Sequence, residues 1–197
     1  MADDTWQDYL QQAHDHLRNK NVEQAGASFT LAIELCPDNA RLYVIRAQFY
    51  SECDKFDRAI ADLSAAIELM PNTPMFFVAR GKAYTDIGDL DHAIDDYTSA
   101  LELSKQQQAD IYHRRALLYK KQDKHTLAVA DFTSAASHNP RSFRHILERA
   151  TVYEQIGDLA SACADLERVL ELCGPEHPEV PAVQERLATL RDHLALS

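Results

Sequence analysis

The sequence predicts an all-α fold in which pairs of antiparallel helices stack on one another. Three features of its 197 residues support this prediction. First, a pattern of small and aromatic residues recurs five times, at a spacing of 34 or 35 residues. Second, each copy contains two stretches whose apolar residues follow the spacing of an amphipathic helix. Third, only five glycines occur, which suits helices better than a turn-rich sheet.

The repeat is clearest between residues 74 and 103. Gly88 and Asp89 divide this stretch into two helices of about four turns each. The apolar stripe of the first helix contains Phe77, Gly81 and Tyr84, and that of the second contains Ala93, Tyr97 and Ala100. One such pair cannot bury both stripes by itself, so it needs copies of itself on both sides.

The copies define five repeats in a single repeat domain, residues 1–197. Their bounds are about 6–39, 40–73, 74–108, 109–142 and 143–176. A small residue recurs in each first helix, at Ala13, Ala47, Gly81, Ala116 and Ala150, and in each second helix, at Ala25, Ala59, Ala93, Ala128 and Ala162. Small side chains at facing levels let two helices approach, and bulky neighbours fill the gaps. Pro37 and Pro71 close the first two repeats, whereas the third has Lys105 in a longer polar turn.

This order of small residues, aromatic residues and a closing proline resembles the tetratricopeptide repeat, a helix–turn–helix unit of 34 residues. The resemblance covers roughly residues 6–174. It implies a right-handed α-solenoid, or superhelix, in which the first helices line a concave groove and the second helices form the back. It also implies a non-enzymatic protein–protein interaction module, such as an adaptor, a scaffold or a co-chaperone, that binds a peptide or helix in the groove.

An amphipathic helix is predicted after the fifth repeat, at about residues 178–195. Its apolar stripe comprises Val180, Val183, Leu187, Leu190 and Leu194. Stacked arrays need a helix with a polar outer face at an open end, so we interpret this segment as a capping helix. The alternative is a partner-binding helix.

An arginine and an aspartate, sixteen residues apart, recur in repeats two to five. The pairs are Arg46 and Asp62, Arg80 and Asp96, Arg115 and Asp131, and Arg149 and Asp165. In the first repeat both partners change together, to Gln12 and Ser28. In an antiparallel pair whose small residues face each other, these levels lie close, so we predict four Arg–Asp contacts with a structural role.

The sequence shows no site for chemistry. Its net charge of −11 argues against non-specific binding to nucleic acid or anionic membranes. No apolar run approaches the roughly 18 residues of a membrane span, and the acidic N-terminus lacks the apolar core of a signal peptide. The four cysteines show no paired spacing, and the histidines form no metal-binding motif. We therefore expect a cytoplasmic protein that is not an enzyme, with no catalytic residues, metal, cofactor, nucleic-acid partner or membrane insertion.

The resemblance implies which residues face the groove. The candidates are Leu10, His14, Arg41, Val44, Gln48, Met75, Val78, Lys82, His113, Arg114, Leu117, Arg144 and Leu147. The groove surface carries a net charge of about +2 and the rest of the chain about −13, which favours a protein or peptide partner with acidic groups. A second interpretation stays open, because Asp110 with Arg114, Arg144 with Glu148, and Lys82 with Asp86 are spaced to pair within their own helices.

The best-known groove of this family is a two-carboxylate clamp for the tails of heat-shock chaperones, built from Lys, Asn, Asn, Lys and Arg. In the first three repeats those places hold Leu10, His14, Ile45, Met75 and Ala79, so the intact clamp is absent. An alternative function is a structural subunit of a larger assembly. Such a subunit docks through its convex back or through its N-terminal helix, where Trp6 and Tyr9 lie.

Overall fold

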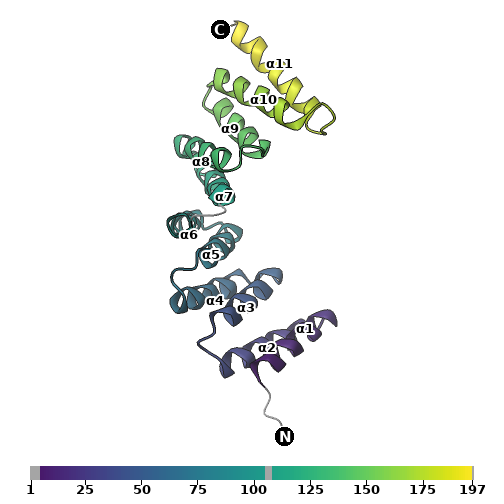
Figure 1. Ribbon diagram of the computed structural model, residues 1–197, viewed down its shortest axis with the longest axis vertical. Coiled ribbons are helices and arrows are strands. Elements are labelled where there is room, and N and C mark those ends of the chain that lie inside the picture. The colour runs from purple at the N-terminus through teal and green to yellow at the C-terminus, as the bar shows by residue number, and fades with distance from the viewer. Residues whose placement is uncertain (1–4, 105–107, 197) are drawn as a thin grey trace. The chain divides into compact units, whose positions relative to one another are not determined.

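The structure is a computed structural model that describes residues 5–104 and 108–196. Within these residues it contains eleven α-helices and no β-strand, so the predicted all-α class is confirmed. The helices are α1 (Trp6–Arg18), α2 (Val22–Leu35), α3 (Ala40–Glu52), α4 (Phe56–Leu69), α5 (Pro74–Ile87), α6 (Leu90–Leu103), α7 (Gln108–Lys121), α8 (His125–His138), α9 (Phe143–Gln155), α10 (Leu159–Cys173) and α11 (Val180–Leu196) (Figure 1).

The helices belong to two compact units. Unit 1 ends at Leu103 and holds α1–α6, and unit 2 starts at Ser104 and holds α7–α11. Within each unit, consecutive helices pair and each pair packs on the next. A single domain spanning all repeats stays a prediction, and the polar turn around Lys105 lies outside the described residues.

Turns within the repeats share one backbone conformation. Gly88 and Gly157 have φ values of 83° and 77°, in the left-handed region. Lys20, Asp54 and Asp123 occupy the same place in their repeats and have φ values of 60°, 56° and 56°. This conformation costs a residue with a Cβ roughly 1–2 kcal/mol. The packing of the two helices therefore imposes the turn, whether or not the sequence provides glycine.

The recurring small residues lie where the two helices of a repeat touch. The alanines among them are 0–1% exposed in every repeat. Gly81 replaces alanine in the third repeat, where the neighbouring core residue is Tyr97. A Cβ added at Gly81 would lie 3.2 Å from Tyr97 Cε1 and 3.3 Å from the carbonyl oxygen of Ala93. Close packing thus selects glycine at this position.

The Arg–Asp pairs form a ladder inside the stack. In each pair, arginine Nε and Nη2 donate to both carboxylate oxygens of the aspartate, at 2.6–2.9 Å, as the sixteen-residue spacing predicts. All four aspartates are buried, with 4–6% of their surface exposed. A bidentate pair in this setting fixes the level of one helix against the other.

The ladder also joins neighbouring repeats, which the sequence had not indicated. Arg46 Nη1 donates to the hydroxyl of Thr30 at 3.1 Å, and Arg80 Nη1 donates to that of Ser64 at 2.9 Å. In unit 2, Arg149 Nη1 donates to the hydroxyl of Thr133 at 2.8 Å. Each hydroxyl belongs to the second helix of the preceding repeat. One guanidinium therefore bonds two repeats at once.

The outer side of α1 is polar where the corresponding side of α3 is apolar. Leu42 and Phe49 of α3 are 2% and 4% exposed and pack against residues of α2. Asp8 and Asp15 stand 34 residues earlier, at the matching positions of α1, and both are exposed. Asp8 also caps its own helix, since its carboxylate accepts from the Thr5 backbone N–H at 2.7 Å. The first repeat, which has Gln12 and Ser28 in place of the Arg–Asp pair, thus also exposes to solvent the side of α1 that carries Asp8 and Asp15.

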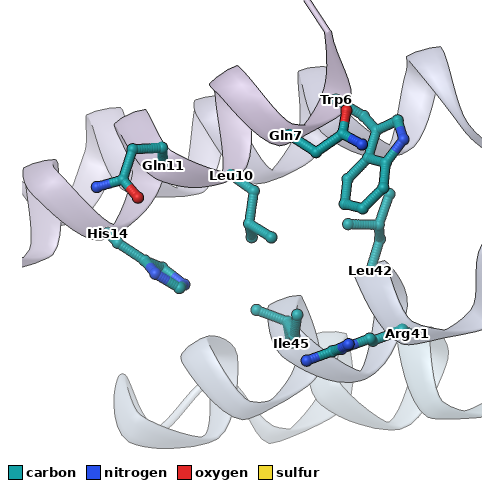
Figure 2. A pocket seen from close by; sticks show the side chains of 8 residues that line it. All are labelled: Trp6, Gln7, Leu10, Gln11, His14, Arg41, Leu42 and Ile45. Atoms are coloured by element: carbon teal, nitrogen blue, oxygen red, sulfur yellow. The ribbon is translucent and has the colours of Figure 1, made fainter.

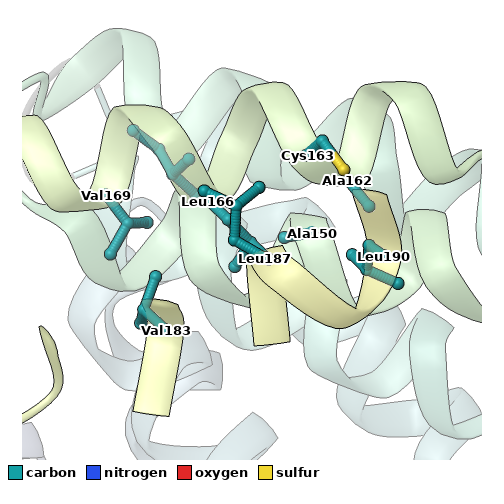
Figure 3. Packing of buried hydrophobic residues seen from close by; sticks show 9 residues of the cluster. Ala150, Ala162, Cys163, Leu166, Val169, Val183, Leu187 and Leu190 are labelled. Atoms are coloured by element: carbon teal, nitrogen blue, oxygen red, sulfur yellow. The ribbon is translucent and has the colours of Figure 1, made fainter. Parts of the chain in front are cut away.

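Helix α11 covers the end of unit 2. Val183, Leu187 and Leu190 pack against Leu166 and other buried residues of α9 and α10 (Figure 3). Arg186 Nε donates to Glu154 at 2.6 Å and its Nη2 donates to the Thr151 hydroxyl at 2.8 Å. The apolar stripe of α11 is buried against its own unit from Val180 to Leu190, whereas Leu194 is exposed, so this segment is a capping helix.

Candidate partner-binding face

In unit 1, helices α1, α3 and α5 form what we call the first-helix face of that unit. The predicted residues on it are either exposed (His14, Arg41, Gln48, Met75 and Lys82) or half-buried (Leu10, Val44 and Val78). The half-buried ones also support the fold. Val44 packs against the core cluster of Ala47, Ala59 and Leu63. The exposed residues are therefore the better candidates for contacts that belong to a partner.

A pocket of about 260 Å³ opens between α1 and α3 (Figure 2). Its walls are formed by Trp6, Gln7, Leu10, Gln11, His14, Arg41, Leu42 and Ile45. Leu10 and Ile45 point toward one another from the two helices, and the Trp6 ring lies beside Leu42 (Figure 2). The pocket thus has an apolar centre with polar side chains around it.

Three of the pocket residues, Leu10, His14 and Arg41, are on the predicted groove. Trp6, Gln11 and Leu42 were not expected in it. Trp6 is the only tryptophan of the chain and is half-buried against Leu42 and α2. Large aromatic side chains are enriched at protein interfaces, which is the signal that marks Trp6 in the sequence.

In unit 2, helices α7 and α9 form what we call the first-helix face of that unit. Arg114 and Arg144 are exposed on it, whereas Leu117 and Leu147 are half-buried and pack against core clusters. The expectation that His113 is a surface anchor does not hold, since its side chain is 4% exposed. It packs edge-on against Phe132 and His145, so it is left out of the proposed site.

The within-helix ion pairs that the spacing of the groove charges allows do not form among the described residues. Glu148 accepts instead from Lys120 Nζ of the preceding repeat, at 2.8 Å. Lys82, Arg114 and Arg144 have no ion pair with a described carboxylate. Their charges are therefore available to a partner.

Over residues 5–104 and 108–196, no group of three or more His, Cys, Asp or Glu side chains could hold a metal ion. Cys36, Cys53, Cys163 and Cys173 are all free thiols, and burial raises the pKa of the Cys163 and Cys173 thiols, which favours their protonated form. Within the part of the chain that is described, no helix is long and apolar enough to cross a membrane.

A sequence profile of the tetratricopeptide repeat matches residues 54–108 and 113–178, more than half of the chain. The chain therefore belongs to the tetratricopeptide repeat family, as its repeats predicted. Folds of this family serve as protein–protein interaction modules.

Solved structures share the fold. A MamA structure matches with a TM-score of 0.77 and 20% identity over 85% of this chain and 91% of MamA. A tetratricopeptide repeat protein from Parabacteroides merdae matches with a TM-score of 0.78 and 18% identity over 95% and 73% of the two chains. YrrB, described as a repeat protein with an unusual peptide-binding site, matches with a TM-score of 0.63 and 22% identity over 73% and 74%. These identities are evidence of a common fold alone.

Proposed function

We propose that the chain binds an extended peptide or a helix of a partner protein on its first-helix faces. The observation that carries this proposal is the pocket between α1 and α3, whose apolar centre is open to solvent. Its volume of about 260 Å³ lies just below the roughly 300–1,000 Å³ of small-molecule sites, so it suits one large apolar side chain of a partner. The peptide-binding site named for YrrB supports the same use of the fold.

Charge suggests the chemistry next to that side chain. The Arg41 guanidinium borders the pocket, is exposed and makes no ion pair with a described residue. In unit 2, Arg114 and Arg144 are exposed and equally without a described carboxylate partner. Unpaired arginines on an otherwise acidic chain favour a partner with acidic groups, because complementary charge speeds and orients association. The absence of an intact two-carboxylate clamp disfavours a chaperone tail as this partner.

The test uses peptides selected from a displayed random library against the full chain, then labelled for fluorescence anisotropy. Trp6 reports pocket occupancy directly, because it is the only tryptophan. We expect bound peptides to shift Trp6 emission and Arg41→Glu to weaken their binding about tenfold. Arg114→Glu tests the unit 2 face in the same way.

Lys124→Glu is the matched control, because it reverses an exposed charge at the start of a second helix. Its affinity should equal that of the wild type, and circular dichroism should show every variant folded. Peptides that bind without changing Trp6 emission, and with unaltered affinity in Arg41→Glu and Arg114→Glu, would refute the proposal.

The alternative proposal, a structural subunit that docks through its back, rests on exposed leucines of the second helices. Leu31 and Leu35 of α2 are 41% and 54% exposed, and Leu127 of α8 is 48% exposed. Docking through these leucines would not depend on salt concentration. It would be abolished by Leu35→Glu and unchanged by Arg41→Glu. Docking through the N-terminal helix would instead be lost in Trp6→Ala.

A further inference from the structure

Two buried histidines meet between the fourth and fifth repeats. His113 of α7 and His145 of α9 are 4% and 3% exposed, and their Nδ1 atoms lie 3.0 Å apart. One ring must donate and the other accept across this contact, so the accepting ring is neutral in the packed state. The two Nε2 atoms are buried as well, with no hydrogen-bond partner among residues 5–104 and 108–196.

Other repeats build the same contact from apolar side chains. At the position of His113, the first repeat has Leu10, and at the position of His145 the second has Leu42. Leu10 packs against the cluster that contains Leu42, so the contact between α1 and α3 is aliphatic. The imidazole pair is thus not a requirement of the repeat, and a leucine pair satisfies the same place in the same chain.

A proton added to either imidazole ring would place a positive charge in buried, largely apolar surroundings. The edge of His113 rests on the Phe132 ring of α8, whose neighbouring Asp131 is bound by Arg115. The charged groups that act on the pair are Asp110 of α7 and Arg144 and Glu148 of α9. Glu148 already accepts from Lys120, which reduces its power to stabilise an imidazolium.

We propose that the His113–His145 pair makes the packing of α7 on α9 acid-sensitive, so that protonation of either ring separates these helices. A charged imidazolium with an unpartnered Nε2–H must reach water or a carboxylate, and in this place either requires the helices to part. The first-helix face of unit 2, which carries Arg114 and Arg144, would then change with pH. This inference concerns stability and does not depend on the proposed peptide binding.

The direction of the effect follows from the pKa values. Burial lowers the pKa of His113 from 6.5 to about 4, with Arg144 and His145 adding to the shift, and burial lowers the pKa of His145 too. A group whose folded pKa lies below its unfolded pKa stabilises the fold above the unfolded value. That contribution is lost as the pH falls from 6.5 toward 4.

The decisive experiment compares the wild type with the double variant His113→Leu, His145→Leu, which places leucine at both positions, as Leu10 and Leu42 do in the first two repeats. Thermal melts of the full chain are recorded at pH 7.5 and pH 5.0. We expect the Tm of the wild type to fall by about 4 °C more than that of the variant, which retains every carboxylate. The control His14→Leu, His138→Leu removes two exposed histidines and should keep the wild-type pH dependence.

Equal falls in Tm for the wild type and the leucine variant would overturn the proposal. If the variant does not fold, NMR of the wild-type imidazole protons decides instead. The proposal expects the His113 and His145 signals not to titrate between pH 8 and about 5.5. Titration of both rings near pH 6.5 with intact structure would refute it.

Discussion

The two units place different chemistry at the same position of the same repeat. Between α1 and α3 of unit 1 these positions hold Leu10 and Leu42, which line an open pocket. Between α7 and α9 of unit 2 they hold His113 and His145, which are buried against each other. The contacts between small residues recur in every repeat of both units, and the Arg–Asp pair recurs in all repeats but the first.

This difference separates two kinds of position. Residues that hold one helix against its partner are repeated because every repeat must solve the same packing problem. Residues at which successive first helices meet can vary between repeats, because the fold requires only that their side chains fill the space between the two helices. Function in a stacked protein is therefore expected at the second kind of position, and the predictions below test whether the division holds.

The ladder should contribute equally in both units, and its loss should have the largest effect. Arg80→Gln leaves Asp96 buried without its partner, which is expected to cost about 3–5 kcal/mol of unfolding free energy. Arg149→Gln, in unit 2, should cost a similar amount. Urea unfolding followed by circular dichroism measures both.

The matched control is the double variant Arg80→Gln, Asp96→Ser, which copies the Gln12 and Ser28 of the first repeat. It should recover much of the stability, because no unpaired buried charge remains. If either single variant loses less than about 1 kcal/mol of unfolding free energy, its Arg–Asp pair contributes no more than an exposed surface ion pair. The ladder would then not contribute equally in the two units.

The second largest effect is expected at the capping helix α11, at the end of unit 2. Leu187→Ala removes a buried contact of the capping helix and should cost about 2–5 kcal/mol. Leu194→Ala, on the same helix, should cost much less, because Leu194 is 39% exposed. Hydrogen exchange of α11 and α10 locates the change. Similar effects of the two substitutions would show that the helix does not cap the unit through its buried stripe.

A smaller effect on stability is expected at Gly81, which is the one position in the series of small residues that is not alanine. Gly81→Ala gains helix propensity of up to about 1 kcal/mol but places a Cβ 3.2 Å from the Tyr97 ring, an overpacking that costs about 1–3 kcal/mol. The net result should be a lower midpoint of urea unfolding. Adding Tyr97→Leu, which copies Ala47 with Leu63 of the second repeat, should reverse the effect of the alanine. If Gly81→Ala stabilises the protein, space at this contact does not select glycine.

The smallest effect concerns the turns. Lys20→Gly relieves a left-handed residue with a φ of 60° and should raise stability by about 0.5–1 kcal/mol after the entropy of glycine is subtracted. Gly157→Lys, the reverse change in unit 2, should lower it by a similar amount. Thermal melts of the two variants give the comparison, and a loss of stability in Lys20→Gly would mean that the Lys20 side chain makes a contact of its own.

Sequence reasoning identified most of the fold and part of the candidate site. It found the helix pairs, the facing alanines, the capping helix and the partners in the Arg–Asp ladder. It missed the hydroxyls of Thr30, Ser64 and Thr133, which bind the third arginine nitrogen from the preceding repeat. It also placed His113 on the surface, because the resemblance to the repeat family implies that first helices line a groove, whereas His113 is 4% exposed.

Periodicity along the chain determined by itself that this protein is a stack of helix pairs, because each helix shows its buried face in its own spacing. Only the tertiary structure decided which side chains meet between successive first helices: that Leu10 and Ile45 enclose a pocket with Trp6, that Glu148 pairs with Lys120, and that His113 is buried against His145. The physical reason is that these contacts join residues about 30 positions apart, whose separation depends on how one repeat packs on the next, and no local pattern records it.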